Sequence, residues 1–247
     1  MGEQGQAETI TAVRLSQAAP GERRALLDAY TREVYVPAFP DEAIREDTSY
    51  WLELMESEPW PAPPQPLLEV ILIIEGKRVL GGVTIELYRA ATVGFLTYIA
   101  VADAARGKGV GRRLVAAARA WLDEVGGADV PMLAETERFE DATTQAEREA
   151  TVLRQRRLAG LGARLLDFDY IMPPLRPGLH PHRLHLMVFG AVETLSGRRV
   201  LGLLEELAHA LGTDLERFQD TKAMAAALAD DPVLAVKPLP KGGPNGG

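Results

Sequence analysis

The stretch Arg106-Gly-Lys-Gly-Val-Gly111 determines how the rest of this chain is interpreted. It follows an apolar run at residues 93–101 (VGFLTYIAV) that is typical of a strand, and it precedes a segment with Leu114, Ala118 and Leu122 on one helical face. Glycine accepts positive φ, so consecutive N–H groups of such a loop can point into one concavity. The helix adds its unpaired N–H groups and the positive end of its dipole. The pattern therefore predicts a binding site for a diphosphate.

The spacing of the loop excludes two common kinds of phosphate-binding loop. A Walker A loop requires Ser or Thr directly after Gly-Lys, and none follows here. A dinucleotide fingerprint requires G-x-G-x-x-G, whereas Gly107, Gly109 and Gly111 give G-x-G-x-G. The cationic side chains that accompany the glycines are Arg106, Lys108, Arg112 and Arg113. A glycine-rich turn with incidental basic residues is the structural alternative.

Arg106, Gly109 and Gly111 form the pattern R-x-x-G-x-G, which resembles the motif [QR]-x-x-G-x-[GA] of the GCN5-related N-acetyltransferase (GNAT) superfamily. The preceding strand ends in the I-x-V unit Ile99 and Val101, as it does in that family. The resemblance covers roughly residues 10–190 and implies an α/β (α+β type) GNAT fold, with a mixed, mostly antiparallel central sheet flanked by helices. Beyond Gly190 the composition changes, and an apolar helical stripe predicts a C-terminal helical extension outside the resemblance. The expected domains are a GNAT acyl-CoA-dependent N-acyltransferase domain at 1–190, the helical extension at 191–236 and a flexible tail at 237–247.

Hydrophobic periodicity predicts the individual elements. We expect strands at residues 10–16, 67–75, 79–88, 93–101, 132–136, 165–172 and 184–189. We expect helices after Pro20, at 41–55 with Asp41 as the cap, from Gly109 to Gly126, at 145–161, from Val200 to Gly212, and from a capping box at Thr213 and Glu216 to about Asp230.

The resemblance implies transfer of an acetyl group from acetyl-CoA to a primary amine by direct attack in a ternary complex. By the family pattern, the backbone of Ile99 and Val101 contacts the pantetheine. The residues implied to bind the diphosphate are Arg106, Gly107, Lys108, Gly109, Val110, Gly111 and Arg112. The alternative function is a non-catalytic acyl-CoA-binding regulatory or interaction module on the same fold.

Three side chains are candidates for proton transfer. Glu135 and Glu137 lie two residues apart on a predicted strand, which places them on the same side; two exposed glutamates at a strand end are the alternative. Tyr98 lies on the pantetheine strand, and packing as a core aromatic is its alternative. Many family members have a tyrosine acid at the position of Leu158, so Tyr170 or water would have to serve here.

The acceptor is not identified by the sequence. The family builds the acceptor pocket from its first two helices, so the candidate lining residues are Tyr35, Phe39, Trp51 and Trp60, with core packing as the alternative. The histidines His180, His182 and His185 cluster without nearby carboxylates in the sequence, so we expect no metal.

The composition limits the class of protein. The 247 residues include no cysteine and carry a net charge of −8, which argues against a thiolate site and against binding to nucleic acid. There is no signal peptide pattern and no apolar run long enough to span a bilayer, so a cytoplasmic protein that does not bind a membrane is expected. The apolar stripe that begins at Val200 predicts either packing within the chain or a homodimer contact.

Overall fold

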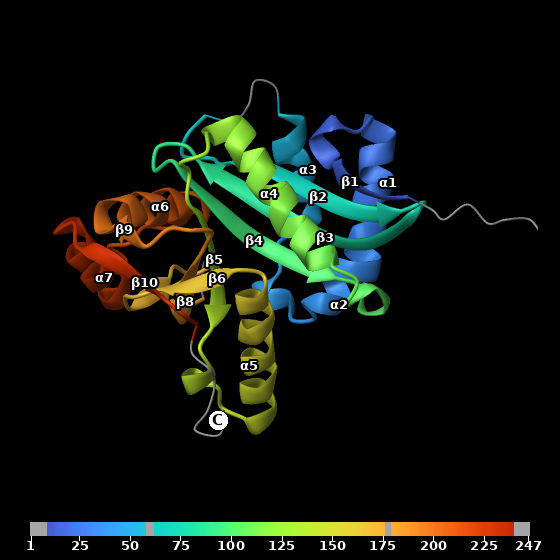
Figure 1. Ribbon diagram of the computed structural model, residues 1–247. Helices are drawn as coiled ribbons and strands as arrows, with labels where there is room; N and C mark the ends of the chain where they lie inside the picture. The colour runs from blue at the N-terminus through green and yellow to red at the C-terminus, as the bar shows by residue number, and fades with distance from the viewer. Residues whose placement is uncertain (1–8, 58–61, 176–178, 240–247) are drawn as a thin grey trace, which may run out of the picture. The chain divides into compact units, whose positions relative to one another are not determined.

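The computed structural model describes residues 9–57, 62–175 and 179–239 (Figure 1). Its strands are β1 (Ile10–Arg14), β2 (Leu67–Glu75), β3 (Arg78–Tyr88), β4 (Val93–Val101), β5 (Met132–Glu137), β6 (Ala163–Leu166), β7 (Tyr170–Met172), β8 (His182–Phe189), β9 (Thr194–Ser196) and β10 (Val233–Lys237). Its α-helices are α1 (Pro20–Tyr30), α2 (Val36–Ala38), α3 (Thr48–Glu56), α4 (Val110–Gly126), α5 (Gln145–Gly160), α6 (Gly197–Ala210) and α7 (Gln219–Ala229). Shorter turns are the 3-10 segments η1 (Leu15–Gln17), η3 (Glu42–Ile44), η4 (Asp103–Ala105) and η5 (Phe139–Asp141), and the π-helical segment η2 (Thr31–Tyr35). Within these ranges, no helix has the length and apolar character that a membrane span requires.

The strands follow the order β1-β2-β3-β4-β5-β8-β6-β10-β9, and β7 pairs with β8. Strands β4 and β5 are parallel, and residues 94–96 pair with residues 132–134. The pairs that β8 forms with β5, β6 and β7 are antiparallel, as are β1 with β2 and β10 with β6 and β9. The expected mixed α/β fold, with a mostly antiparallel sheet flanked by helices, is confirmed.

The chain packs as two units, and β3 and β4 pass through both. The first unit comprises Met1–Trp60, Leu68–Ile85 and Thr97–Trp121, and the second comprises Pro61–Leu67, Glu86–Leu96 and Leu122–Gly247. Each unit has its own cluster of buried apolar side chains.

In the first unit, two adjacent glycines of β3 allow helices to approach both faces of the strand. A Cβ at Gly81 would stand 3.1 Å from Cγ1 of Val110, at the start of α4, whereas a Cβ at Gly82 would stand 2.5 Å from the ring of Tyr30 in α1. Because successive strand residues point to opposite faces, α4 covers one face of this strand and α1 the other (Figure 1). The contact fixes the first turn of α4 directly above the sheet.

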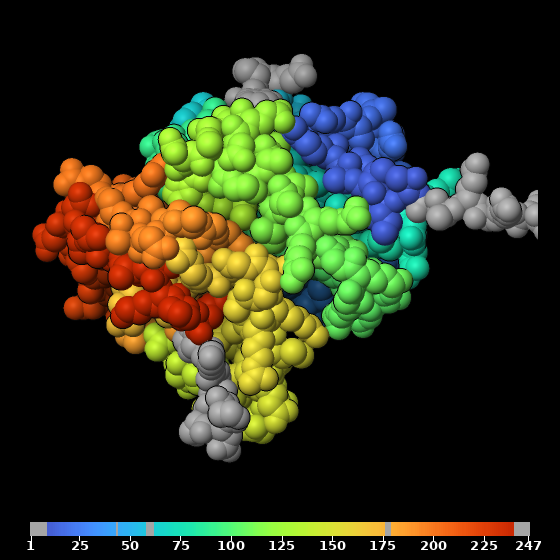
Figure 2. Space-filling model, viewed as in Figure 1, coloured from blue at the N-terminus to red at the C-terminus, as the bar shows by residue number. Residues whose placement is uncertain are grey.

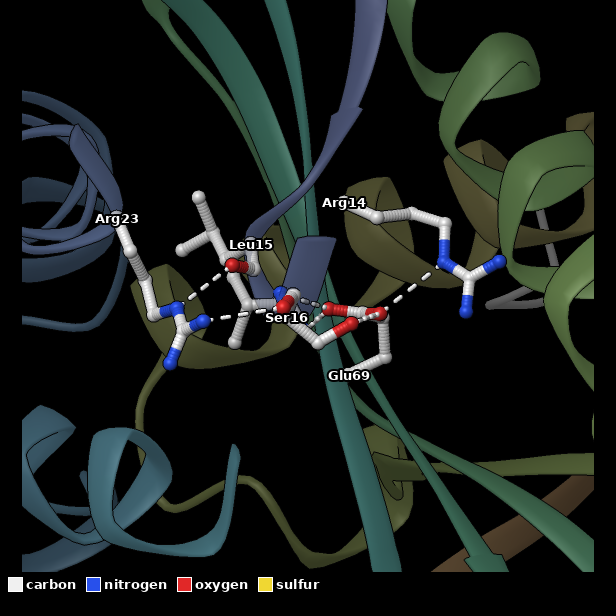
Figure 3. A network of polar contacts seen from close by, with 6 residues as sticks. Arg14, Leu15, Ser16, Arg23 and Glu69 are labelled. Carbon is white, nitrogen blue, oxygen red and sulfur yellow. Dashed lines mark hydrogen bonds and ion pairs between the residues drawn. The ribbon is translucent and has the colours of Figure 1, made fainter. Parts of the chain in front are cut away.

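A polar network joins the corner after β1 to β2 in the same unit (Figure 3). The buried carboxylate of Glu69 accepts hydrogen bonds from Nε of Arg14 at 3.1 Å and from the Ser16 N–H at 3.0 Å, and also from the Ser16 hydroxyl. The guanidinium of Arg23 donates to the carbonyl oxygens of Leu15 and Ser16 at 2.9 and 3.0 Å. Each buried charge is thereby met by several partners, as a structural role requires.

In the second unit, the C-terminal segment supplies part of the core. The apolar stripe of α6 is buried and packs in one cluster with Tyr88, Val93 and Phe95 of the β3–β4 hairpin. The carboxylate of Glu206 also accepts hydrogen bonds from backbone N–H groups of that hairpin, including Ala91 at 2.7 Å. The stripe therefore packs within the chain, which was one of the two alternatives that the sequence left open.

Some boundaries and elements differ from those expected. The prediction of a helix opened by Thr213 is wrong, because the Thr213 N–H donates to the Ala208 carbonyl oxygen and closes α6, and α7 begins only at Gln219. Asp47, and not Asp41, caps α3. The expected strand at 165–172 is two strands, β6 and β7, and the extension also forms β9 and β10. Of the expected flexible tail, residues 240–247 lie outside the described residues.

Candidate functional site

The candidate diphosphate loop leaves the end of β4 through η4. The Ala102 N–H donates to the Leu80 carbonyl oxygen at 2.9 Å, which ties this exit to β3. Gly107 and Gly109 then adopt φ of +77° and +79°, a region that L-amino acids with a Cβ rarely enter. The expected positive-φ glycines are thus present in the loop, directly before the first residue of α4.

The start of α4 is anchored by buried side chains, and its loop side is open. The side chains of Val110 and Leu114, both in α4, are buried. Nothing lies within 4 Å of the position that a Cβ would take at Gly107 or Gly109. The first N–H groups of a helix have no partner within it, so those of α4 are directed toward this open side. Figure 2 shows the loop and the outer side of α4, in green, at the molecular surface. Unpaired N–H groups beside open space are suited to bind an anion.

The cations of the loop differ in their surroundings. The Arg106 guanidinium forms an ion pair with Asp103 at 2.6 Å, which neutralises part of its charge. Lys108, Arg112 and Arg113 are exposed. Their positive charge is therefore available to a ligand that approaches the loop from solvent.

The last residues of β4 alternate in burial. Tyr98 and Ala100 are buried on one side, whereas Ile99 and Val101 are half-buried on the other. The two residues predicted to contact pantetheine therefore share a face and differ from Tyr98 in the side that they present.

Tyr98 belongs to an aromatic cluster of the first unit. Its ring centroid lies 5.1 Å from that of Tyr35, 5.2 Å from Phe39 and 5.5 Å from Trp51, and its hydroxyl donates to the Ile44 carbonyl oxygen at 3.0 Å. Three of the four predicted acceptor-lining residues are thus brought together around Tyr98. Trp60, the fourth, lies outside the described residues.

Glu46 lies at the border of this cluster, and no motif in the sequence marks it as a functional residue. Its carboxylate accepts a hydrogen bond from the Trp51 indole N–H at 2.6 Å, and its backbone N–H donates to the Tyr35 hydroxyl at 3.0 Å. Burial raises the pKa of the Glu46 carboxyl, although the indole hydrogen bond opposes the shift. Burial likewise raises the pKa of Tyr35 to about 12.

In the second unit, Glu135 is paired with Tyr170, the residue considered above as a replacement acid. The Tyr170 hydroxyl, which is buried, donates to Glu135 Oε2 at 2.8 Å. Burial and then the negative charge of Glu135 raise the pKa of Tyr170 well above its ordinary value. The phenol therefore stays protonated and Glu135 accepts its hydrogen, so the two form a donor–acceptor pair.

Glu137 has different partners. Its carboxylate forms an ion pair with Arg154 of α5, and its carbonyl oxygen accepts from Gln155 Nε2 at 2.7 Å. Leu158, which stands where many family members have a tyrosine, is buried on the same helix. These contacts connect the end of β5 to α5.

Among the histidines considered as metal ligands, His185 lies on β8 opposite Thr136. Its Nε2 is 3.8 Å from a carboxylate oxygen of Glu140, and burial lowers its pKa. Across residues 9–57, 62–175 and 179–239, no three His, Asp or Glu side chains are grouped as a metal site would require.

Comparisons with known proteins bear on the family. Residues 28–145 match the model of the acetyltransferase (GNAT) family. The chain is similar in structure to a protein from Bacteroides thetaiotaomicron described as a GNAT-family acetyltransferase, with 19% identity, a TM-score of 0.49 and coverage of 74% of this chain and 89% of the other. It is also similar to an acyl-CoA N-acyltransferase from Pseudomonas aeruginosa (13% identity, TM-score 0.44, coverage 74% and 100%). It is similar as well to GCN5 from Tetrahymena, with 12% identity, a TM-score of 0.46 and coverage of 73% of this chain and 96% of the other. The comparison with curated proteins gave no match. By its family match, the chain carries a GNAT acetyltransferase domain at residues 28–145.

Proposed function

We propose that this chain transfers an acetyl group from acetyl-CoA to a primary amine. Membership of the domain in the GNAT acetyltransferase family supports acyl transfer in general. The main support for acetyl-CoA as the acyl donor is the loop before α4, where Gly107 and Gly109 have positive φ and open space beside them. The N–H groups of the first turn, together with Lys108 and Arg112, are suited to bind the diphosphate of acetyl-CoA. The backbone of Ile99 and Val101 would contact its pantetheine.

In the proposed reaction, the neutral amine nitrogen attacks the thioester carbonyl carbon directly. A C–N bond forms, the C–S bond breaks, and the electron pair of that bond leaves on the thiolate. An N–H donor from the end of β4 would stabilise the oxyanion. No nucleophile from the enzyme takes part, which agrees with a sequence without cysteine.

The amine nitrogen must lose a proton during the reaction, and we propose Glu135 as the base that receives it. Glu135 is preferred to Glu137 because the buried Tyr170 hydroxyl donates to its carboxylate and orients it. It is preferred to Tyr98 because that hydroxyl already donates to Ile44 and its ring is packed among aromatic side chains.

The test is release of free CoA from acetyl-CoA in the presence of a panel of primary amines. We expect amine-dependent release, and we expect Glu135→Gln to lower kcat by about 100-fold or more, in the range that general base catalysis contributes. Glu137→Gln is the matched control, and its effect should be much smaller. Equal losses in the two variants would remove Glu135 from the role of base.

The same experiment addresses the non-catalytic alternative, which the buried Leu158 favours because it cannot protonate a leaving thiolate. Saturable binding of acetyl-CoA without amine-dependent thiol release would show a binding module. A thiol has an ordinary pKa of about 8.5, so a thiolate can leave without full protonation. The cytoplasmic location and the homodimer stay predictions from the sequence.

A further inference from the structure

Two glutamates of the first unit differ in their surroundings: Glu69 is fully buried and Glu46 is half-buried. Glu69 is met by Arg14, by the N–H and hydroxyl of Ser16, and by the N–H of Val70. Glu46 is half-buried, and within the described part of the chain its carboxylate has one hydrogen-bond donor, the indole of Trp51, and no ion pair. A carboxylate that is partly withdrawn from water gains from pairing with a cation or with several donors, and Glu46 lacks a partner of positive charge among the described residues.

The surroundings of Glu46 are aromatic and held in place. Trp51 is fully buried, so its indole N–H presents a fixed donor to Oε2, and the Tyr35 hydroxyl fixes the backbone at Glu46. Phe39, which is half-buried, packs on Tyr35 with ring centroids 5.4 Å apart. A carboxylate oxygen beside aromatic rings is the combination by which proteins bind organic ammonium groups, through ion pairing and attraction to the ring faces.

The cluster is also tied to the strand that leads to the loop. Tyr98 of β4 contacts both Tyr35 and Trp51, and it directly precedes Ile99, which the proposed function assigns to pantetheine. Tyr98 also donates to Ile44, two residues before Glu46. The segment that carries Glu46 is therefore anchored to the strand that the proposed function assigns to the acyl donor.

We propose that Glu46 binds the positively charged nitrogen of the acceptor, so that the substrates are organic ammonium compounds with an apolar group next to the cation. The identification of this ligand as the acceptor rests on the proposed function. Binding of the ligand to Glu46 can be measured without turnover. On binding, the ammonium pairs with the carboxylate oxygen that does not accept from Trp51. It then releases one proton to solvent, and the neutral amine attacks as in the proposed reaction. Glu46 then determines specificity by excluding neutral and anionic compounds of the same shape.

The test uses the full chain labelled with ¹⁵N and follows the indole N–H resonance of Trp51, assigned by its loss in Trp51→Phe. The probe is benzylammonium, and benzyl alcohol and phenylacetate are its neutral and anionic counterparts. We expect a saturable shift of the indole resonance with benzylammonium and none with the other two compounds. Glu46→Gln keeps the size of the side chain and an acceptor for the indole, and it should weaken binding at least tenfold. Glu42→Gln, an exposed residue paired with Arg45, should leave binding unchanged.

The outcomes separate this inference from the proposed function, because acetyl-CoA affinity is measured on the same samples. If benzylammonium and benzyl alcohol shift the resonance equally, or if Glu46→Gln binds benzylammonium as tightly as the wild type, the ammonium site is wrong even where acetyl-CoA binds. If benzylammonium binds through Glu46 but acetyl-CoA does not bind, the ammonium site stands and the acetyl transfer is wrong. The comparison of charged and neutral probes on the wild type needs no variant, so it holds even where Glu46→Gln fails to fold.

Discussion

Gly109 combines a φ of +79° with open space where a side chain would stand. At the residue scale, we expect Gly109→Asp to weaken acetyl-CoA binding by ~100-fold or more. The carboxylate would repel the diphosphate, and two like charges about 4 Å apart near a protein surface repel by roughly 4 kcal/mol. The new Cβ would also keep the ligand from the backbone. Isothermal titration calorimetry with acetyl-CoA measures the change.

Gly127 provides the matched control for that substitution. It also has a positive φ, of +96°, and nothing lies within 4 Å of its Cβ position, but it follows the other end of α4. Gly127→Asp therefore imposes the same kind of backbone strain and the same added charge far from the loop. Retained affinity in a folded Gly109→Asp variant, or equal losses in both variants, would remove the loop from the donor site.

Glu46 should reduce the stability of the fold at neutral pH. Because burial raises the pKa of its carboxyl above the value in the unfolded chain, the folded state binds more protons between the two pKa values, and the free energy of unfolding falls as pH rises through that interval. We expect Glu46→Gln to have a higher Tm than the wild type at pH 7.5. The difference should shrink toward pH 4, where both side chains are neutral. Thermal unfolding across this pH range tests the sign, with Glu42→Gln as the control.

The two sites differ in how far the sequence reveals them. The loop was predictable because its chemistry is local: alternate glycines, basic residues and the start of a helix stand within one short stretch. Glu46 was not predictable, because it is one of four acidic residues in the stretch 41–47 and nothing in that run marks it. Its distinction comes from Trp51 and from the burial that tertiary packing imposes.

At the scale of elements, one carboxylate connects α6 to the turn between β3 and β4. Glu206 accepts from the N–H groups of Ala90 and Ala91 at 3.3 and 2.7 Å, and it is largely buried. We expect Glu206→Ala to lower the free energy of unfolding by about 1–3 kcal/mol, because two backbone donors lose their acceptor. Glu205→Ala removes an exposed neighbour on the same helix and should cost much less. Urea unfolding of the two variants compares them, and equal midpoints would show that the contact is not stabilising.

Elements with strong periodicity were predicted closely, and short ones were not. The strands β2 and β4 have the predicted bounds, since long apolar runs between turn residues leave few alternatives. Strand β10 was missed because its pairing partners, β6 and β9, are distant in sequence and only tertiary structure brings them to it. The prediction of a capping box at Thr213 was wrong for a different reason. The Thr213 N–H donates to the Ala208 carbonyl oxygen and so ends the preceding helix, α6.

At the scale of the whole molecule, the boundary at Gly190 that the family resemblance implies divides residues that share one core. Tyr88, Val93 and Phe95 precede the boundary, and the stripe of α6 that covers them follows it. Strand β10 also follows the boundary, yet it pairs with β6 before it. The extension is therefore expected to be required for folding of the second unit rather than to be an independent addition.

Truncation after Gly190 tests this expectation. Removing the extension would expose the buried side chains of the hairpin and one edge of β6, and burial of each large apolar side chain contributes on the order of 1.5–3 kcal/mol. We expect a truncated chain that aggregates, or that binds a hydrophobic dye and has lost its cooperative thermal transition. Truncation after Leu239 keeps every described residue and is the control. A chain ending at Gly190 that stays monomeric on size-exclusion chromatography, with the Tm of the full protein, would show instead that residues 1–190 fold alone and that the extension serves another purpose.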